Sequence, residues 1–380
     1  MVTYLDNAAS TRIDERVLEA MLPYLKENYG NPSSAHKQGK ILKVFIEDAR
    51  DVVADFLGTK PKEIFFTSGG TESNNFAIKG FAFSRDDKYH SITSSIEHPA
   101  VLETFSYLNK FGYETDIVKP DNKGNVSSEN IQSRIKNNTK LVSIMHANNE
   151  LGIVNDVKSI SQVCKSKGIY FHSDTVQSIG KMSVKPKELG MDFITMSAHK
   201  IYGPKGVGVL FIDENVKIDK YVHGGSQERN MRGGTENIAS IAGLKFAIEI
   251  LKESMDEDIK HYTELKINLI AELNNSFKDM FIINGDENNS LSNILNVSFL
   301  PDRLKVSSGM LPIQLDLKDV SVSGGSACSS GSLKPSNVLL ELGMEESLAS
   351  STIRISFGRF NMREDNVKLV KSLKEIFGIV

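Results

Sequence analysis

Short apolar runs alternate with turns and helical segments between residues 61 and 213. The runs predict seven strands: "EIFFTS" (63–68), "HSITSS" (90–95), "YETDIV" (113–118), "KLVSIMH" (140–146), "IYFHS" (169–173), "DFITM" (192–196) and "GVGVLFI" (206–212). Helical spacing in segments between them, such as residues 155–168, favours βαβ units and a largely parallel sheet. Ligands of such sheets lie beyond the carboxyl ends of the strands, so we expect functional residues directly after apolar runs.

A strongly helical stretch at residues 236–277 separates this region from the rest of the chain. After it, the pattern predicts four short strands and two helices: "FIIN" (281–284), "NILNVSF" (293–299), "VSVS" (320–323), "TIRISF" (352–357), "PSNVLLELG" (335–343) and "REDNVKLVKSLKEIFG" (363–378). We therefore expect a large α/β domain over residues 16–257. A smaller α/β domain is expected to combine residues 258–380 with residues 1–15.

Composition narrows the classes of protein to consider. The chain has 380 residues, 40% hydrophobic and 24% charged, as in soluble globular proteins. Its net charge of −3 gives no general attraction to nucleic acid or to a membrane surface, and no apolar run approaches a membrane span. The first residues resemble no secretory signal, and two cysteines cannot form a disulfide framework. These features predict a cytoplasmic protein.

The stretch "SAHKIYGPKG" (197–206) follows a predicted strand and contains Lys200, next to His199, in a turn rich in glycine and proline. A lysine amine becomes a nucleophile toward carbonyl groups when burial or nearby positive charge lowers its pKa. Lys200 is therefore a candidate to hold an aldehyde cofactor, pyridoxal phosphate. The alternative is one more solvated lysine, so the remaining parts of such a site must be found independently.

A phosphate site is predicted at "FFTSGGTESNN", where a strand leads through two glycines into a helix. Gly70 lets the backbone approach an oxyanion, and Thr71 adds a hydroxyl at the helix N-terminus. The glycine spacing matches neither the dinucleotide fingerprint nor the P-loop. An ordinary strand–helix turn is the alternative.

A carboxylate for the pyridine nitrogen is predicted at Asp174, which ends the strand in "FHSDTVQS". It would keep the ring protonated and therefore able to accept electrons. Gln177, one turn later, can donate to the phenolic oxygen of the ring. Alternation also puts His172 on the same face as Asp174, which leaves a metal pair as an alternative. No Cys/His cluster elsewhere completes a metal site, so none is expected.

Two further candidates follow strands. His98 opens a helix in "SSIEHPAV", where its ring can stack on the cofactor and move protons. Asn149 in "HANNELG" can contact the ring or the substrate carboxylate. Arg354 in "SSTIRISFGRFN" projects from the polar face of a predicted strand and can grip a carboxylate, with Arg359 as a competing candidate.

The two cysteines have different surroundings. Cys164 lies on a helix with apolar neighbours at helical spacing, so we assign it to the core. Cys328 in "SVSGGSACSSGSLKPS" has only small and polar neighbours. A loop of this composition suits a thiol that must reach into a site and withdraw again. A surface cysteine without chemistry is the alternative.

Taken together, these stretches resemble the cysteine desulfurases of the NifS/IscS-like branch, pyridoxal phosphate enzymes related to class V aminotransferases. The resemblance covers nearly the whole chain in ordered motifs: "YLDNAAST", "NPSSAH", "TSGGTESNN", "EHPAV", "SIMHANNELG", "HSDTVQSIGK", "SAHKIYGPKGVG", "RGGTENIASIAG", "SGGSACSSG" and "IRISFGRF". It implies the aspartate aminotransferase-like fold, with a mainly parallel seven-stranded sheet and a smaller C-terminal α/β domain.

The resemblance also implies roles for individual residues. Lys200 would be the Schiff-base lysine, and His98 the stacking residue and proton shuttle. Asp174 would pair with the pyridinium and Gln177 with the phenolic oxygen. Asn149 and Arg354 would bind the carboxylate of L-cysteine. The phosphate would be held by four residues of the same chain: Gly70, Thr71, Ser197 and His199.

In this family Thr235 of "RGGT" matches a residue that reaches the phosphate of the other subunit, which implies a homodimer. The Cys328 thiolate would attack the sulfur of the substrate, leaving a persulfide and releasing alanine. The "ACSSG" and "RGGTEN" motifs favour a supply of sulfur to iron–sulfur assembly or tRNA thiolation. Some members have a longer C-terminal tail that docks a scaffold, whereas this sequence ends at Val380, so scaffold docking stays open.

Two other classes of function are weighed against this one. An aminotransferase or selenocysteine lyase can use the same scaffold, but transamination needs no loop thiol. A cofactor-free structural relative has no need of the lysine, aspartate and cysteine that this sequence retains.

Overall fold

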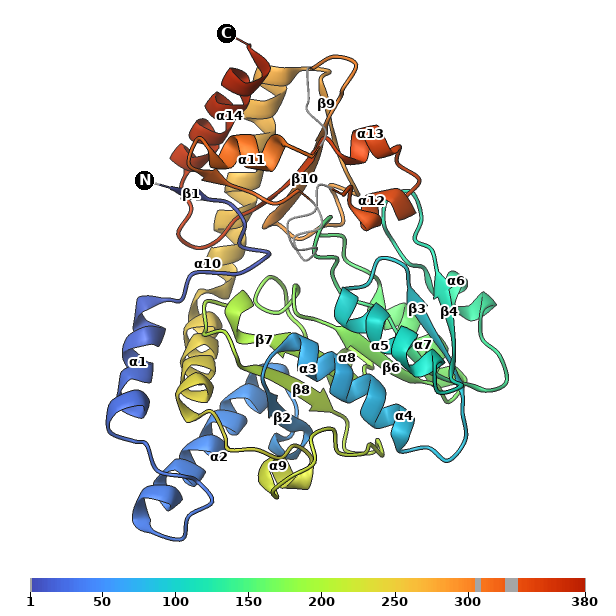
Figure 1. The fold of residues 1–380 in the computed structure, drawn as a ribbon, viewed down its shortest axis with the longest axis vertical. Coiled ribbons are helices and arrows are strands. Elements are labelled where there is room, and N and C mark those ends of the chain that lie inside the picture. The colour runs from blue at the N-terminus through green and yellow to red at the C-terminus, as the bar shows by residue number, and fades with distance from the viewer. Residues whose placement is uncertain (1, 305–308, 325–333, 380) are drawn as a thin grey trace.

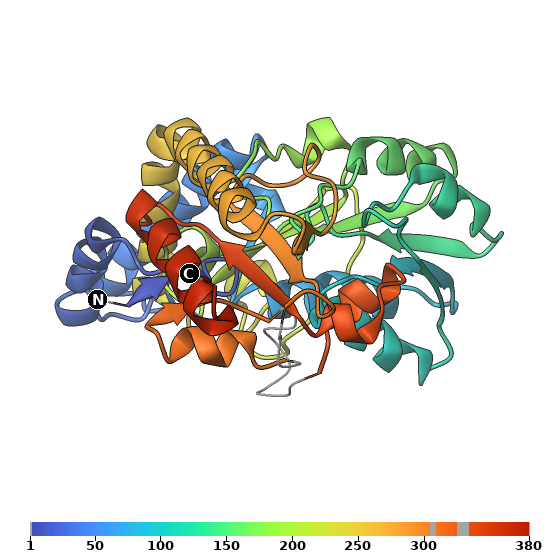
Figure 2. The same ribbon diagram turned by 90° about the horizontal axis from the view of Figure 1, so that it is seen from above.

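The computed structural model describes residues 2–304, 309–324 and 334–379. A seven-stranded sheet with helices on both faces forms the larger, lower part of the molecule in Figure 1, and a smaller α/β part lies above it. Seen from above, α1 and α2 lie at one end of the molecule and β3 and β4 lie toward the other (Figure 2). The fold is the one expected from the sequence.

The large sheet has the strand order β2-β8-β7-β6-β5-β3-β4, and every strand except β8 runs in the same direction. Its strands are β2 (Ile64–Thr67), β3 (His90–Ser94), β4 (Glu114–Val118), β5 (Thr139–Ser143), β6 (Tyr170–Asp174), β7 (Phe193–Ser197) and β8 (Gly208–Ile212). Each lies within three residues of its predicted bounds. The loop between β7 and β8 is too short for a parallel crossover, so β8 returns antiparallel.

Helices cover both faces of this sheet. Alternate side chains of one strand enter different apolar clusters: Phe65 faces one cluster, while Ile64 and Phe66 face the other. The helical segments of this part are α1 (Glu15–Lys26), α2 (Lys37–Leu57), η1 (Pro61–Glu63), α3 (Gly70–Asn75), η2 (Phe76–Gly80), α4 (Phe81–Phe83), α5 (Pro99–Asn109), α6 (Ser128–Ser133), α7 (Val157–Ser166), α8 (Pro186–Leu189), η3 (Ala198–Lys200), α9 (Gln227–Asn230) and α10 (Ile238–Phe277). Burial on both faces explains why the strands are continuous apolar runs.

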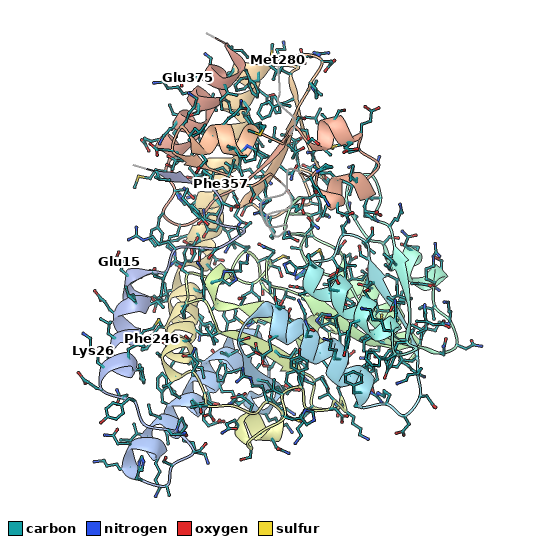
Figure 3. The ribbon with its side chains drawn as sticks, in the orientation of Figure 1. Glu15, Lys26, Phe246, Met280, Phe357 and Glu375 are labelled. Atoms are coloured by element: carbon teal, nitrogen blue, oxygen red, sulfur yellow. The ribbon has the colours of Figure 1, made fainter. Side chains whose placement is uncertain are left out.

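The smaller part is built on an antiparallel sheet of order β12-β10-β9, beside the short parallel pair β1 and β11. Its elements are β1 (Thr3–Tyr4), β9 (Phe281–Ile283), β10 (Ile294–Phe299), α11 (Leu311–Asp316), β11 (Val320–Ser321), α12 (Asn337–Glu341), α13 (Glu346–Ala349), β12 (Thr352–Ser356) and α14 (Arg363–Phe377). In Figure 3, Phe357 lies near the base of this part, and Met280 and Glu375 lie near its outer end.

One 40-residue helix, α10, runs through both parts. Its residues up to Leu251 belong to the cluster under the large sheet, and those from Tyr262 onward belong to the cluster of the smaller part, which also includes Leu5. The expected boundary between residues 257 and 258 falls inside this helix. The division into domains stays a prediction.

Candidate functional site

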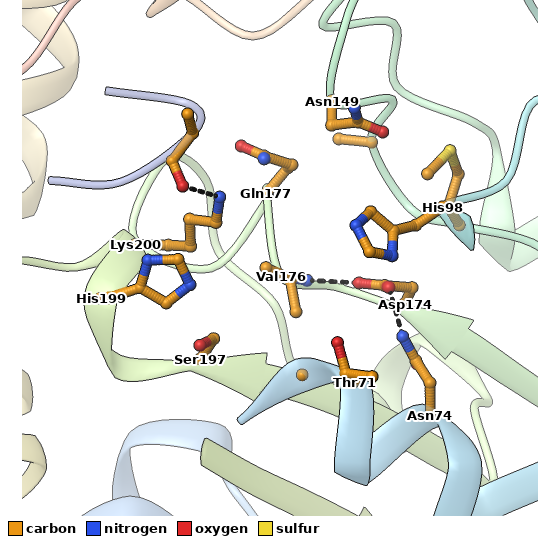
Figure 4. Close-up of a pocket in the computed structure, with 14 residues that line it drawn as sticks. Thr71, Asn74, His98, Asn149, Asp174, Val176, Gln177, Ser197, His199 and Lys200 are labelled. Carbon is orange, nitrogen blue, oxygen red and sulfur yellow. Dashed lines mark hydrogen bonds between the residues drawn. The ribbon is translucent and has the colours of Figure 1, made fainter. Parts of the chain in front are cut away.

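A pocket lies at the carboxyl ends of the parallel strands (Figure 4). The segments that follow β2, β3, β5, β6 and β7 each contribute to its wall, as expected for the chemistry-bearing residues of such a sheet. It is lined by Ala9, Gly70, Thr71, Asn74, His98, Met145, Ala147, Asn149, Asp174, Val176, Gln177, Ser197, His199 and Lys200. Nine residues predicted from the sequence therefore meet in one cavity.

Lys200 enters the pocket from η3, the turn that follows β7. Its Nζ donates hydrogen bonds to the carbonyl oxygens of Ala8 and Ala9, at 2.5 and 2.7 Å. The N-terminal segment is fixed to the same turn, because Thr11 binds the carbonyl of His199 through both its N–H and its hydroxyl. A segment nearly 200 residues away in sequence thus forms the wall against which the lysine amine rests.

The first turn of α3 forms the floor of the pocket. α3, η2 and α4 follow one another without a break, so this turn begins a continuous helical segment, and its N–H groups carry the positive end of the helix dipole. A Cβ on Gly70 would lie 2.8 Å from Cγ2 of Val176, so any larger residue would force the Val176 side chain to move. Thr71 presents its hydroxyl to the cavity from this turn (Figure 4).

Asp174, at the end of β6, is buried and held in place by two donors. Its Oδ2 accepts a hydrogen bond from Nδ2 of Asn74 at 2.6 Å, and its Oδ1 accepts one from the Val176 N–H at 2.9 Å. Asn74 accepts in turn from Thr195 on the neighbouring strand β7. The carboxylate orientation is therefore fixed by the sheet and by α3 together.

His98 is the N-cap of α5, as expected for a histidine that opens a helix. Its Nδ1 accepts the N–H of Ala100 at 3.1 Å, so in the neutral ring the proton lies on Nε2. The ring points into the pocket above Asp174 in Figure 4. On the opposite wall, Nε2 of Gln177 donates to the Ala8 carbonyl at 2.9 Å.

Ser197 and His199 line the pocket next to Lys200. Burial, and then the positive charges of Lys200 and Lys205, lower the pKa of His199 to about 4. Its ring is therefore neutral at physiological pH, and its Nδ1 lies 3.3 Å from the Ser10 hydroxyl.

The two candidate arginines have different environments. Arg354 is almost completely buried and lies behind Asn149: its Nη1 donates to the Asn149 carbonyl at 2.8 Å, and its Nη2 pairs with Asp6 at 2.7 Å. Its Nε has no hydrogen-bond partner among the described residues. Arg359 is held by Asp258 and Asp14 in an ion-pair network away from the pocket lining.

Of the predicted site residues that the structure describes, Arg354 and Thr235 do not line this pocket. Thr235 is exposed and lies in a separate hollow with Arg232 and Ser68. Cys328 lies outside the described residues. Cys164 is buried in the core, as expected, and burial raises the pKa of its thiol to about 12.

Sequence reasoning missed several residues that shape the site. Asn74 is a buried amide one turn after Thr71, and its place on the inner face of the helix is the signal that it supports another polar group. Glu97 is buried between two strand ends, accepts from the Met145 N–H at 2.6 Å, and burial raises its pKa well above the ordinary value. The Ala8 and Ala9 carbonyls are backbone groups, for which no side chain gives a signal.

The donor set fits pyridoxal phosphate. A helix N-terminus with a glycine approach suits the phosphate, a fixed carboxylate suits the pyridine nitrogen, and a lysine amine suits the aldehyde. His172 lies beneath the sheet-end carboxylate but is fully buried, with its Nδ1 on the Ser143 hydroxyl. No group of three or more His, Cys, Asp or Glu in the described part of the chain is arranged to hold a metal ion.

Comparison with known proteins gives a consistent family. The model of the class V aminotransferase family matches residues 3–369. The chain is 46% identical over 363 residues to the cysteine desulfurase IscS of Dictyoglomus turgidum, which covers 95% of this chain and 91% of that one. A solved NifS-like protein superposes with a TM-score of 0.92, at 38% identity and full coverage of both chains. A structure of SspA in complex with cysteine gives a TM-score of 0.84 at 36% identity, covering 95% of this chain and 100% of that one.

A pocket built around Lys200 and Asp174 on this fold, together with matches along almost the full length, leads to one assignment. The chain belongs to the class V aminotransferase family and, within it, to the IscS/NifS-like cysteine desulfurases, which depend on pyridoxal phosphate.

Proposed function

We propose that this protein removes sulfur from L-cysteine with the help of pyridoxal phosphate, releases L-alanine, and carries the sulfur as a persulfide on Cys328. The activity and the cofactor follow from membership of the cysteine desulfurases. The roles of individual residues are supported by one observation. The pocket is lined by Lys200, Asp174, Gln177 and His98 together.

When bound, pyridoxal phosphate supplies an electron sink that weakens the bonds at the α-carbon of an amino acid. Asp174, fixed by Asn74, would keep the ring nitrogen protonated, and Gly70 and Thr71 would hold the phosphate at the helix N-terminus. The neutral ring of His199 and the Ser197 hydroxyl would complete that hydrogen-bonding set.

Lys200 and His98 are the groups that would move protons. The Nζ of Lys200 is held at the pocket wall by two carbonyl acceptors, in the same cavity as His98. Because Nδ1 of His98 accepts the Ala100 N–H, the neutral ring has its proton on Nε2 and would take up a second proton at Nδ1, giving up that hydrogen bond. Asn149 and Arg354 would hold the substrate carboxylate, Arg354 also supporting Asn149 from behind.

At Cys328 the balance of bonds is simple. The thiolate forms an S–S bond with the substrate sulfur, the bond between that sulfur and Cβ breaks, and Cβ takes up a proton as the product becomes alanine. A thiol acceptor later removes the terminal sulfur. We assign Cys328 this role from its sequence setting.

The activity is tested by incubating the protein with L-cysteine and dithiothreitol and measuring alanine and sulfide. Lys200→Ala is expected to lose the visible absorbance of the cofactor adduct and both products. Cys328→Ser is expected to lose sulfide release while retaining the cofactor. Cys164→Ala, which removes the buried thiol, is the matched control and should keep both. Equal sulfide output from wild type and Cys328→Ser would contradict the persulfide mechanism.

A homodimer in which Thr235 reaches the phosphate of the partner subunit is part of the proposal. Its support is the placement of Thr235 on the surface, apart from the pocket of its own chain. Mixed dimers of Lys200→Ala and Thr235→Ala chains test it, because one of their two sites would then contain both intact residues. Recovery of activity in isolated mixed dimers is expected. If Thr235 acted within its own chain, no site would be complete.

We further propose a cytoplasmic location, with iron–sulfur assembly or tRNA thiolation as the destination of the sulfur. The presence of only two cysteines supports a reducing compartment. No helix in the described part of the chain is long and apolar enough to cross a membrane. Transfer of ³⁵S from labelled cysteine to co-purified acceptors, compared between wild type and Cys328→Ser, identifies the acceptor class.

A further inference from the structure

A buried lysine lies directly behind the cofactor lysine. Lys181 is 7% exposed, and its Nζ donates a hydrogen bond to the backbone carbonyl of Lys200 at 3.3 Å. The ammonium group lies 5.8 Å from the ring centre of Tyr202 and 5.6 Å from that of Tyr262. Within residues 2–304, 309–324 and 334–379, no carboxylate lies within ion-pair distance of it.

This arrangement is costly for a structural lysine. Burying an ammonium group without a paired carboxylate costs several kcal/mol, and an apolar side chain of similar length would avoid that cost. Burial lowers the pKa of Lys181 to about 8, so the side chain still carries its charge at neutral pH. A charged group is thus retained against a single carbonyl acceptor, and that carbonyl belongs to Lys200.

Three charged groups face Lys181, each from a different element. Asp258 of α10 favours its charge, whereas Arg359, from the connection between β12 and α14, and Lys200 of η3 oppose it. Asp258 is already bound by Arg359, at 2.7 Å. Asp258 has the largest effect of the three on the charge of Lys181, and Arg359 and Lys200 act together against it.

The repulsion between two positive charges acts equally on both. If Lys200 makes the charge of Lys181 less favourable, Lys181 has the same effect on the charge of Lys200. An uncharged amine at Lys200 is what reaction with an aldehyde requires, and a cationic neighbour is one of the ways in which proteins obtain one.

We propose that Lys181 is a positioning residue for Lys200: it anchors the turn through the Lys200 carbonyl, and its positive charge favours the uncharged form of the Lys200 amine. The proposal rests on the assignment of Lys200 as the cofactor lysine under the proposed function. It adds that Lys181, on the far side of the turn from the pocket, influences the reactivity of this amine.

Three variants separate charge from packing. Lys181→Arg keeps the charge, Lys181→Gln keeps a hydrogen-bond donor without charge, and Lys181→Met keeps only the volume. The matched control is Lys266→Met, which removes another buried lysine whose pKa is lowered to about 8 and which binds Ser290 and Leu291 instead. Thermal unfolding of each full-length variant reports any general loss of stability.

The test is competitive acetylation of the full-length, cofactor-free chain across a pH series, with Lys200 followed by peptide mass spectrometry. The Gln and Met variants should move the midpoint of Lys200 labelling upward by about one pH unit, a roughly tenfold slower labelling below the midpoint. Uptake of added pyridoxal phosphate at pH 7, followed by visible absorbance, should slow about tenfold as well. Lys181→Arg and Lys266→Met should match wild type.

An unchanged midpoint in the Gln and Met variants overturns the proposal. An equal shift in all three Lys181 variants overturns it as well, because the effect would then come from packing. If Lys181→Arg does not fold, Lys181→Gln decides, since it keeps a donor at the same place. Labelling reads the Lys200 amine directly, so the answer does not depend on whether the protein releases sulfur from cysteine.

Discussion

Asn74 illustrates how a single buried amide controls a functional carboxylate. It joins Asp174 to Thr195, and with the Val176 N–H it gives the carboxylate two hydrogen bonds that a rotation would break. An orienting partner of this kind acts on the cofactor only through Asp174. Its loss should therefore weaken cofactor binding more than it affects folding.

We predict that Asn74→Ala lowers the affinity for pyridoxal phosphate about tenfold, because removing a hydrogen bond to a charged group costs about 1.5–3 kcal/mol. Titration of the cofactor-free protein by absorbance measures this. Asn130→Ala, which removes an exposed amide, should leave the affinity unchanged. Equal affinities of wild type and Asn74→Ala would show that the carboxylate is held by the Val176 N–H alone.

Glu150 is a second buried carboxyl whose charge depends on pH. It accepts a hydrogen bond from Ser336, the N-cap of α12, and burial raises its pKa to about 7. The folded state therefore binds this proton more tightly than the unfolded state. The stabilisation is fully present below pH 4.5 and is lost as the pH rises through 7.

Glu150→Gln removes this dependence, since the amide is neutral at every pH. We expect the variant and wild type to unfold alike at pH 5, and the variant to gain about 3 kcal/mol over wild type at pH 8.5. Urea unfolding at the two pH values measures the difference. The exposed Glu15→Gln serves as control and should show no change with pH.

The sequence predicts most side chains of the site, because each follows an apolar run that ends at the same edge of the sheet. Lys200, Asp174 and His98 are examples. It does not predict what holds them, since backbone carbonyls such as that of Ala8 have no residue signature. Glu97 and Asn74 lie beside recognised motif residues, but only packing shows that they point inward.

At the scale of elements, the short α9 segment shows how a buried ion pair shapes the backbone. Glu228, Arg229 and Asn230 all have positive φ, which residues with a Cβ adopt at a cost. Glu228 is fixed by Arg50, at 2.8 Å, and by the Phe66 N–H of β2. This anchoring holds the segment that leads to Thr235.

We predict that Glu228→Gln lowers the free energy of unfolding by about 3–5 kcal/mol, because it leaves the buried charge of Arg50 paired only with the half-exposed Glu47. Glu47→Gln is a matched control: it contacts the same arginine, but its side chain is 52% exposed. Its effect should stay below about 1 kcal/mol. Comparable losses in the two variants would mean that burial of the pair is not decisive.

The strand pattern is predictable because buried parallel strands are apolar along their whole length. The pattern predicts no element before residue 61, where the structure has β1, α1 and α2. In α1 the exposed Leu18, Leu22 and Leu25 blur the periodicity, and Pro23 interrupts the helical signal. The pairing of β1 with β11 joins distant segments, which local sequence cannot specify.

At the scale of the whole molecule, Arg359 connects three segments that belong to different parts of the chain. Its guanidinium binds Asp14 at the start of α1 and Asp258 on α10, and its own backbone follows β12. The guanidinium of Arg359 therefore links the N-terminal segment, the long helix and the smaller sheet. On α10 its partner Asp258 lies between Leu251 of one apolar cluster and Tyr262 of the other.

Arg359→Met should lower the free energy of unfolding by about 3 kcal/mol, since it leaves two buried carboxylates with fewer donors. Calorimetry measures the loss and also shows whether the two parts still unfold together. Arg12→Met removes an arginine that is 68% exposed and pairs with Glu15, and it should change stability by less than about 1 kcal/mol. If both variants behave alike, the network contributes no more than a surface pair.

The N-terminal wall of the pocket has a consequence for biosynthesis. Ala8 and Ala9, which hold Lys200, are tied to β12 through the N–H of Ala8 on the Ser356 hydroxyl and the N–H of Ser356 on the Leu5 carbonyl. Ser356 is 348 residues after Ala8, so the ribosome makes the partner strand long after these alanines. A nascent chain can thus form the parallel sheet early, yet this wall of the cofactor site cannot be completed until β12 has been synthesised.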